Sequence, residues 1–378
     1  MLSLSPEVEE LRRRAREFCT KLKEMKVPED KVPRLMGEEG FLQYLVPKKY
    51  GGVYETVKVL PLCVIRETFA QHYLPLSSIF TVMGLGSMPI VIAGSEEQKL
   101  RYLPRIASGE IASAFAATEP SAGSDLGGIE TIYKRDGGEF IINGTKNFVS
   151  RAEFADFIVV LAKSDRSRGT KNISAFIVEK GTKGMRIERM ESMVDEVLNI
   201  ITFDDCRIPA ENLIGKEGDG FSIAMRSLNI FRTTVASHAI GVAQAAIDTA
   251  IRYSMKRKLF GELLINFQET KFKIEDMVTK LFAMRYMTYA AARALDENSE
   301  DGPLLASMSK LFCTETAQDI VDKALQILGG YGLLKDYPLE KLFRDIRSAR
   351  IYEGTSEVQK LIISRFVLKR FEEGKGLW

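Results

Sequence analysis

Apolar and polar positions follow three successive patterns along the chain. Up to about residue 112 the apolar residues repeat with a helical period, with late breaks near 96–99 and 103–105. Short β-branched runs and turn sequences then continue to about residue 212, after which the helical period returns. A change of period indicates a change of secondary structure. We therefore expect an N-terminal α domain over 1–112, a β domain over 113–212 and a C-terminal helical domain over 213–378.

Four apolar runs in the middle zone predict β-strands. They are rich in β-branched and aromatic residues, which fit a pleated, half-buried surface. The runs lie at 140–144, 157–161, 173–178 and 200–203. One turn sequence lies at 136–138, just before the first run, and another at 168–170, between the second and third runs, as expected for strands that are joined by short loops. The middle domain is therefore predicted to be an antiparallel sheet.

Four helical segments are predicted in the C-terminal zone, near 220–259, 264–297, 303–328 and 356–372. Packed together, they would form an antiparallel four-helix bundle. The fold class that follows is α+β, with helical domains before and after the β domain along the chain. Two apolar stripes carry the helical signal, namely Ala243, Ala246, Ile247, Ala250 and Ile251, and then Leu311, Thr314, Ala317, Ile320, Val321, Ala324 and Leu328.

Residues 74–95 contain no charged side chain and are nearly long enough to span a membrane. Pro75 and Pro89 interrupt the stretch, and serines and glycines dilute it. We expect a pair of buried helices that lines a pocket, and no membrane span; membrane contact is the alternative. Gly84 and Gly86 do not form a dinucleotide fingerprint, because no strand precedes them and the third glycine is missing.

The N-terminus predicts a helix rather than a signal peptide. Ser5 is placed to cap an amphipathic helix whose first position is Pro6. The cysteines at 19, 63, 206 and 313 are scattered without a C-x-x-C pair, which excludes zinc ribbons and disulfide scaffolds and fits a reducing compartment. We therefore expect a cytoplasmic protein without a bound metal.

Charge and histidine content exclude two further classes. Lys and Arg number 53 against 51 Asp and Glu, so the net charge of +2 argues against a nucleic-acid partner. His72 and His238 are the only histidines, and no G-x-S-x-G sequence accompanies them. A hydrolytic triad is therefore disfavoured, and we expect both histidines to be structural.

The strongest candidate for chemistry is the segment Ile351-Tyr352-Glu353-Gly354-Thr355-Ser356-Glu357, at a break between two predicted helices. A helix break leaves backbone N–H groups free to face a ligand. Glu353 would act as a general base if a pocket dried it and raised its pKa. The alternative is a solvated loop glutamate, as most glutamates are exposed.

Two further segments favour the functional interpretation. Phe115 to Asp125 contains small residues, hydroxyls and Gly123, which let a backbone approach a planar or phosphorylated ligand. Gln326 to Gly332 ends a predicted helix in glycines and is followed by Tyr337-Pro338 and Arg344-Asp345. Each alone could be a turn or a helix C-cap. Together, in this order and spacing, they resemble the acyl-CoA dehydrogenase family through essentially the whole chain.

The resemblance implies a reaction and its participants. A base removes the α-proton of an acyl-CoA thioester while the β-hydride passes to N5 of FAD, giving a trans-2-enoyl-CoA. The base would be Glu353, whose backbone N–H would meet the thioester oxygen, with Gly354 giving room. The family's second base position corresponds to Phe231, which cannot be a base. An electron-transfer flavoprotein would receive the electrons, and the subunits would form a homotetramer that is a dimer of dimers.

The resemblance also assigns contacts residue by residue. Asn229 stands where some relatives carry Asp, and Phe148 could instead be a core strand residue. The implied FAD contacts are Phe115, Ala117, Thr118, Gly123, Ser124, Phe148, Ser150, Gln326, Gly329, Gly330, Thr355 and Glu357, with Arg257, Phe260 and Gln268 reaching the FAD of a neighbouring subunit. The implied acyl-CoA contacts are Ser124, Asn229, Arg232 and Gly354.

Two departures from the family pattern bear on the site. Relatives usually follow the position of Ser150 with Asn-Gly, whereas this chain has Arg151-Ala152, so the loop on the flavin side could differ in shape. Residues 74–95 lack the arginine of glutaryl-CoA-specific relatives, which disfavours a dicarboxylate substrate. The rival interpretations are an oxidase-like flavoenzyme that uses oxygen, and a non-catalytic FAD-binding assembly protein on the same fold.

Overall fold

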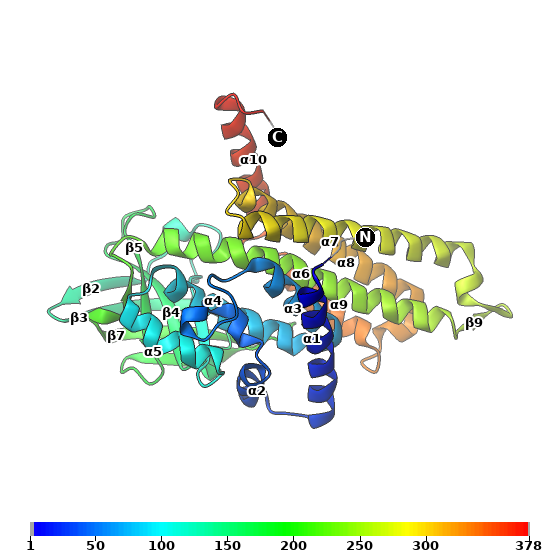
Figure 1. Cartoon of the computed structure of the whole chain (residues 1–378), viewed down its shortest axis with the longest axis horizontal. Coiled ribbons are helices and arrows are strands. Elements are labelled where there is room, and N and C mark those ends of the chain that lie inside the picture. Colours follow the sequence, from blue (N-terminus) through cyan, green and yellow to red (C-terminus); the bar gives the residue numbers. More distant parts are fainter. Residues whose placement is uncertain (1–3, 377–378) are drawn as a thin grey trace. The chain divides into compact units, whose positions relative to one another are not determined.

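The computed structural model describes residues 4–376 of the chain. N-terminal helices, a middle sheet and C-terminal helices follow one another, which confirms the α+β fold class (Figure 1). The chain divides into two compact units. The first comprises the described parts of Met1–Met25, Val59–Ser77 and Arg232–Trp378, and the second comprises Lys26–Lys58 and Ser78–Phe231. The divisions at residues 77 and 231 fall within two helices, α4 (Leu74–Ala93) and α6 (Gly220–Ser254).

The first unit is helical. Its long helices α7 and α8 pack side by side, as Figure 1 shows in its yellow and orange ribbons. Besides the last part of α6, its elements are α1 (Pro6–Met25), α3 (Val59–His72), the short hairpin β9 (Lys258–Leu259) and β10 (Glu262–Leu263), α7 (Gln268–Asp296), α8 (Gly302–Leu328), α9 (Pro338–Ala349) and α10 (Ser356–Glu372).

The four helices predicted in the C-terminal zone are confirmed, with two differences. α6 ends at Ser254 rather than near residue 259, because the β9–β10 hairpin occupies the start of the connection to α7. α9 was not predicted as a helix. It is only twelve residues long and begins with Pro338 at its first position, where the missing N–H of proline costs nothing.

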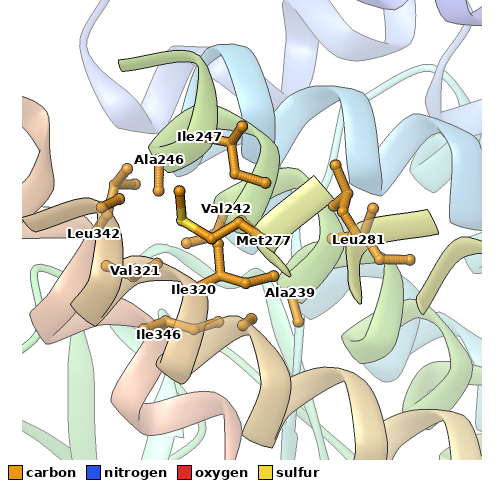
Figure 2. Packing of buried hydrophobic residues seen from close by; sticks show 14 of the residues in the cluster. Ala239, Val242, Ala246, Ile247, Met277, Leu281, Ile320, Val321, Leu342 and Ile346 are labelled. Carbon is orange, nitrogen blue, oxygen red and sulfur yellow. The ribbon is translucent and has the colours of Figure 1, made fainter. Parts of the chain in front are cut away.

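The apolar stripes predicted on α6 and α8 form the core of the first unit. Figure 2 shows Ala246 and Ile247 of α6, Met277 of α7, Val321 of α8 and Leu342 of α9 in one buried cluster. Small residues on α6 bring its backbone close to its neighbours, and larger ones on α7, α8 and α9 fill the remaining space. Burial of these faces supplies most of the free energy that stabilises the helices.

α1 begins as predicted. The backbone N–H of Val8 donates to Ser5 Oγ at 3.4 Å, and α1 starts at Pro6. Its apolar side, which includes Leu11, Phe18 and Leu22, is buried. The four cysteines are buried free thiols.

The second unit is built on an eight-stranded sheet with the order β6-β7-β3-β2-β4-β5-β8, in which β1 pairs with β4. The sheet is antiparallel apart from the pairing of β4 with β1 and one residue pair between β2 and β4. The strands are β1 (Ser113–Ala116), β2 (Ile132–Asp136), β3 (Glu139–Ser150), β4 (Phe157–Lys163), β5 (Ile173–Glu179), β6 (Met185–Met190), β7 (Leu198–Pro209) and β8 (Leu213–Ile214). Short helices α2 (Val32–Glu38) and α5 (Glu96–Ala107) belong to the same unit.

The four predicted strand runs are confirmed in β3, β4, β5 and β7, but the break predicted near 103–105 is wrong. α5 continues through Pro104 to Ala107. The helix has a capping box, in which Gln98 N donates to Ser95 Oγ and Ser95 N donates to Gln98 Oε1. Capping and burial of Tyr102 and Ile106 outweigh the hydrogen bond that proline removes.

The uncharged stretch 74–95 forms the single helix α4 rather than a pair, with Pro89 inside it. Among the described residues it is the one helix with the length and composition of a membrane span. In the structure 72% of its most apolar window is buried, as in the core helix of a globular protein.

Gly84 and Gly86 have a packing role on α4. A Cβ on Gly84 would lie 2.3 Å from the ring of Phe231, and one on Gly86 would lie 2.5 Å from Ser113 Oγ. Phe231 itself is fully buried. The glycines therefore permit close approach of α6 and β1 to α4, which is a different role from nucleotide binding.

Gly84→Ala tests this packing. We expect it to lower the free energy of unfolding by about 1–3 kcal/mol, because the added methyl group must displace Phe231 from a filled core. Gly138→Ala, at a strand turn where a Cβ would meet nothing within 4 Å, is the control. Chemical denaturation followed by circular dichroism gives both values. Equal stability of the two variants would contradict the role assigned to Gly84.

Candidate active site

The candidate base lies on a left-handed turn between α9 and α10. Glu353 has a φ of 55° and Gly354 a φ of 93°. A non-glycine residue in this region is strained and is found mostly where function requires it. The backbone hydrogen bonds of the turn run from Ile351 N and Tyr352 N to Ser348 O and from Ser356 N to Arg350 O, and within the described chain none uses the N–H of Glu353.

Three buried side chains hold the carbonyl groups of this turn. Lys310 Nζ donates to Gly354 O at 2.8 Å, and Gln359 Nε2 donates to the same oxygen at 2.9 Å. Arg232 Nε donates to Glu353 O at 3.1 Å. Because side chains bind both carbonyls, the backbone of the turn is fixed although its conformation is strained.

Gly354 is required by this arrangement. A Cβ there would lie 2.7 Å from Gln359 Nε2, and its φ is one that other residues rarely adopt. The Glu-Gly pair of the motif therefore has a structural reason. A side chain at Gly354 would displace Gln359 from the turn.

The Glu353 side chain is buried, with 6% of its surface exposed, so the solvated-loop alternative is wrong. Its Oε1 lies 4.0 Å from Nη1 of the buried Arg66 on α3. Its Oε2 has no hydrogen-bond partner in the part of the chain that the structure describes. Burial raises the pKa of Glu353 above its ordinary value, although the positive charges of Arg66, Lys310 and Arg232 act in the opposite direction.

A carboxylate in this state is suited to take a proton. It lacks the full set of hydrogen bonds that would stabilise its charge, and burial brings its pKa closer to neutrality than that of an exposed glutamate. Such an environment is the one in which general bases are found. The nearby N–H of Glu353 provides a hydrogen-bond donor on the same residue.

Three members of this constellation were not among the predicted site residues. Arg66 and Lys310 both carry a charge inside otherwise apolar helical faces, which is a signal that the sequence contains. Gln359 offers no such signal. Arg232 was predicted, as an acyl-CoA contact, and the structure places its guanidinium on the backbone of the base.

In the second unit, the two strand segments assigned to the flavin lie side by side. Asn147 N donates to Thr118 O at 2.8 Å, and Lys146 Nζ donates to Ala117 O at 3.1 Å. The structure therefore brings the segment that contains Phe115, Ala117 and Thr118 to the segment that contains Phe148 and Ser150. Ser124 and Gly123 lie in the exposed loop that follows Thr118.

Phe148 is not a core residue. Its side chain is 58% exposed and its φ is 55°, at an irregularity in the pairing of β3 with β7 between Lys146 and Val149. The irregularity turns the ring away from the sheet core, where the strand's alternation would otherwise leave it against neighbouring side chains. The core interpretation of Phe148 is thus wrong.

The Arg151-Ala152 departure has a visible structure. Arg151 is buried, has a φ of 57°, and pairs through Nη1 with Glu29 Oε2 at 2.8 Å. Its guanidinium also lies over the ring of Phe154, 4.9 Å from the centroid. A left-handed turn is therefore kept here without the usual Asn-Gly, and the arginine side chain ties the loop to residue 29.

A buried ion pair underlies the flavin-side loop. Lys146 Nζ lies 2.6 Å from Glu119 Oε1, and both side chains are almost completely buried. Glu119 also accepts the backbone N–H groups of Glu130 and Thr131. Burial lowers the pKa of Lys146 to about 8 although Glu119 opposes the shift. The pair joins the end of β1 to β3 and to the start of β2.

A separate hollow of about 400 Å³ lies in the first unit, where α8 ends in glycines. Arg257, Gly329 and Gly330 line it together with Tyr253 and Tyr331. Neither Gly329 nor Gly330 would place a Cβ within 4 Å of another atom, so the backbone is open to approach. Arg257 lies over the Tyr331 ring at 5.7 Å. Sequence reasoning assigned the arginine and glycines but missed the role of the tyrosines.

Other predicted contacts lie outside this hollow. Phe260 is 89% exposed on the β9–β10 hairpin, and Gln268 and Gln326 are exposed on α7 and α8. Thr355 caps α10 by accepting Val358 N at 3.3 Å, while Glu357 is exposed in the first turn of that helix. Asn229 is half-buried on α6. Among residues 4–376 no group of acidic, histidine and cysteine side chains could hold a metal ion.

His238 occupies a structural position, as expected. His238 is buried, and its Nδ1 lies 2.8 Å from Ser77 Oγ. Burial, with a contribution from Arg66, lowers the pKa of His238 to about 3. His238 is therefore neutral at ordinary pH.

Glu119→Gln tests the buried pair. We expect a loss of about 3–5 kcal/mol in stability, because Lys146 would remain buried without its counter-charge. Glu139→Gln removes a carboxylate that pairs with Arg207 at the surface of the same unit and should cost at most about 1 kcal/mol. Urea denaturation of both variants measures the difference. A loss of similar size in both would contradict a special role for the buried pair.

Comparison with known proteins agrees with this architecture. Three family models match, described as the N-terminal, middle and C-terminal domains of acyl-CoA dehydrogenase, over residues 5–110, 114–206 and 218–368. An acyl-CoA dehydrogenase of Bacillus subtilis is 40% identical over 337 residues, covering 88% of each chain. The caffeyl-CoA reductase-Etf complex subunit CarC of Acetobacterium woodii is 39% identical over 343 residues, covering 89% of each chain.

Solved structures show the same relationship. Butyryl-CoA dehydrogenase from Megasphaera elsdenii superposes with a TM-score of 0.91 at 31% identity, covering 97% of this chain and 100% of that one. A structure of PigA with FAD and proline has a TM-score of 0.91 at 27% identity, covering 98% and 100%. The chain therefore belongs to the acyl-CoA dehydrogenase family.

Proposed function

We propose that the protein dehydrogenates an acyl-CoA thioester to the trans-2-enoyl-CoA, with Glu353 as the base that takes the α-proton. The observation that carries the proposal is the buried Glu353 carboxylate on a strained turn, with one oxygen unpartnered among the described residues. An exposed or fully hydrogen-bonded glutamate would be a poor base at neutral pH. The environment of Glu353 differs from both.

The turn supplies more than the carboxylate. Removal of the α-proton places negative charge on the thioester oxygen, which needs a hydrogen-bond donor in a fixed position. The N–H of Glu353 is the donor that we assign, since the hydrogen bonds of the turn leave it unused. Lys310, Gln359 and Arg232 hold the neighbouring carbonyls, so the donor does not have to be ordered during the reaction.

The residues present fit FAD. The hollow beside Gly329 and Gly330 combines an open backbone with the guanidinium of Arg257, which suits a diphosphate. In the second unit, the exposed ring of Phe148 and the half-buried Thr118 and Ser150 suit a planar, hydrogen-bonding ring system. When bound, FAD would supply the acceptor for the β-hydride.

The remaining contacts are assigned on the family pattern. We assign Phe115, Ala117, Thr118, Gly123, Ser124, Phe148 and Ser150 to the flavin side, and Ser124 and Asn229 to acyl-CoA. Arg232 we assign chiefly to positioning Glu353, because it binds that residue's carbonyl oxygen. Phe260 and Gln268 are exposed, which fits a contact with the FAD of a neighbouring subunit in a homotetramer.

An electron-transfer flavoprotein is the electron acceptor that we propose. The support is a relative that is, by its name, part of a reductase-Etf complex. The retained base disfavours the non-catalytic alternative. The oxidase-like alternative is tested by the rate at which oxygen reoxidises the reduced protein when no other electron acceptor is present. A survey from butyryl-CoA to palmitoyl-CoA, with branched and dicarboxylic acyl groups included, would define the substrate.

The same site could serve the reverse reaction. Several relatives are named reductases, among them an acryloyl-CoA reductase from Anaerotignum propionicum that is 40% identical over 341 residues. In that direction a protonated Glu353 would give the α-proton instead of taking it. Rates of flavin reduction by acyl-CoA and of flavin oxidation by enoyl-CoA, measured at one pH, would show which direction is faster.

Glu353→Gln tests the base. The variant keeps the size and polarity of the side chain but cannot accept the α-proton, so flavin reduction should slow by at least about 10²–10⁴-fold. Stopped-flow bleaching of the flavin by saturating acyl-CoA measures the rate. The exposed carboxylate of Glu372 at the end of α10 gives the control variant Glu372→Gln. A Glu353→Gln rate within about threefold of the parent would exclude Glu353 as the base.

The pH dependence follows from the raised pKa of Glu353. The ionised form is active in dehydrogenation, so the rate should be full above this pKa and should fall as the pH drops through it. The midpoint should lie above the ordinary glutamate value of about 4.3. Flavin-reduction rates across an acid pH series, with acyl-CoA saturating at each pH, give the midpoint. A rate that stays level through this range would contradict the assignment.

Arg257→Ala tests the hollow beside Gly329. Loss of a hydrogen bond to a charged group costs about 1.5–3 kcal/mol, which corresponds to at least about tenfold weaker FAD binding. Turnover of the FAD-loaded variant should change less, because the arginine lies away from Glu353's chemistry. Fluorescence titration of apoprotein measures the affinity. Arg252→Ala removes an exposed arginine near the end of α6 and is the control; equal affinities would remove Arg257 from the site.

A further inference from the structure

Arg66 is a buried cation in the middle of an apolar helix, and the proposed mechanism does not use it. Its side chain is 3% exposed on α3, among buried neighbours such as Ile65 and Phe69. Nη1 donates to Thr234 Oγ1 at 2.8 Å, and Nε has no hydrogen-bond partner among the described residues. A buried charge is retained only where another charge or a set of hydrogen bonds compensates it.

The compensating group is Glu353. Arg66 Nη1 lies 4.0 Å from Glu353 Oε1, and both side chains are buried. At that separation the two groups attract each other without sharing a direct hydrogen bond. Thr234 holds the guanidinium on one side, so Arg66 can act on the carboxylate as a fixed charge.

The other two cations at the site are used differently. Arg232 Nε and Lys310 Nζ donate to the backbone carbonyls of Glu353 and Gly354. They therefore fix where the base is. Arg66 forms an ion pair with the carboxylate itself, and among the cations it has the largest charge effect on Glu353.

We propose that Arg66 is the counter-ion of Glu353, a positioning residue that sets the protonation state of the base and with it the pH range in which the base can take a proton. The proposal rests on the proposed function, in which Glu353 is the base. Arg66 on α3 would thus take part in the chemistry of Glu353, which lies on the turn between α9 and α10.

Several charged groups from different helices act on the pair. The cations near Glu353 are Arg66 on α3, Arg232 on α6 and Lys310 on α8, and each favours the ionised carboxylate. Glu315 and Glu357 act on Lys310, and His238 lies near Arg66 but is neutral. Burial alone would raise the pKa of Glu353 further than the cations allow.

The positive charge of Arg66 should have opposite effects on dehydrogenation and on the reverse reaction. Dehydrogenation uses the ionised carboxylate, and the reverse reaction uses the protonated acid. By favouring the ionised form, Arg66 extends dehydrogenation to lower pH and confines the reverse reaction to more acid conditions. Without this arginine, the pH at which dehydrogenation becomes favoured over the reverse reaction should be higher.

The test is the titration of Glu353 in the FAD-loaded protein without substrate. The infrared carbonyl band of a protonated carboxylic acid, assigned by its loss in Glu353→Gln, reports the protonation state directly. Arg66→Gln should raise the pKa of Glu353 so that its acid dissociation constant falls by at least about tenfold, since an adjacent arginine usually has an effect of this size. Arg66→Lys keeps the charge and should restore most of the parent value.

Activity provides the second readout. In Arg66→Gln the acid limb of flavin reduction should move to higher pH by the same factor of at least about tenfold in proton concentration. The rate at the alkaline plateau should stay within about threefold of the parent, because a less stabilised carboxylate remains an effective base. A merely structural role would lower the plateau or the stability without moving the midpoint.

Arg285→Gln is the matched control. Arg285 Nε pairs with Glu67 Oε1, on the residue that follows Arg66, and it is absent from the charges that act on Glu353. Its loss should leave the Glu353 titration unchanged. An unchanged titration in Arg66→Gln as well, or an equal shift in Arg285→Gln, would overturn the proposal. If Arg66→Gln does not fold, the titration of Glu353 in Arg66→Lys decides. Lysine keeps the positive charge, so a change of about tenfold or more in the acid dissociation constant of Glu353 in this variant would also overturn the proposal.

The outcomes separate the two proposals. If Glu353→Gln retains its flavin reduction, the proposed base fails whatever the titration shows. If the titration does not respond to Arg66 while Glu353→Gln is inactive, the base stands and the counter-ion fails.

Discussion

The strained turn at Glu353 and Gly354 depends on hydrogen bonds to its two carbonyl groups, and the rest of the candidate site depends on that turn. Left-handed backbone at a glutamate is costly unless the surroundings enforce it. Lys310 from α8, Arg232 from α6 and Gln359 from α10 converge on the carbonyls. The helical core behind them therefore has a second purpose beyond stability, since it holds the donors in register.

Buried charge is handled in two ways in this protein. At Glu119 and Lys146 the pair is close, and backbone N–H groups satisfy the carboxylate, so the pair is suited to hold strands in place. At Glu353 the paired cation, Arg66, stands 4.0 Å from one carboxylate oxygen, and the other oxygen has no hydrogen-bond partner among the described residues. The first carboxylate is stabilised in its charged form, and the second is left able to accept a proton.

Much of the fold and of the base could be predicted because their signals are local. Periodicity located the helices α6, α7, α8 and α10 and four of the strands, and the Glu-Gly pair at a helix break marked the site. Pro104 misled because burial in α5 outweighs the lost hydrogen bond, and α9 escaped because it is short. The division near residues 112 and 212, the homotetramer and the cytoplasmic location stay predictions.

The partners of the base could not be predicted from the residues alone. Arg66 and Lys310 lie far from the turn in sequence, and only tertiary packing brings them to it. Gln359 lies five residues after Gly354, but its residue type gives no signal of the contact. Phe148 shows the same limit within a strand, because the irregularity that turns its ring outward has no sequence signal of its own. A charge inside an apolar helical face, as at Arg66, is the one clue that sequence reading could have used.

α8 takes part in both candidate sites of the first unit, the turn that carries Glu353 and the hollow beside Gly329. Lys310 near its start holds the turn of the base, and Gly329 follows its last residue at the hollow with Arg257. At about 1.5 Å per residue the two points are roughly 28 Å apart, and each residue turns the helix by about 100°. One inserted residue between them would swing Lys310 or Gly329 to a different face. The length and the helical rotation of α8 between Lys310 and Gly329 therefore fix the position of one site relative to the other within the first unit.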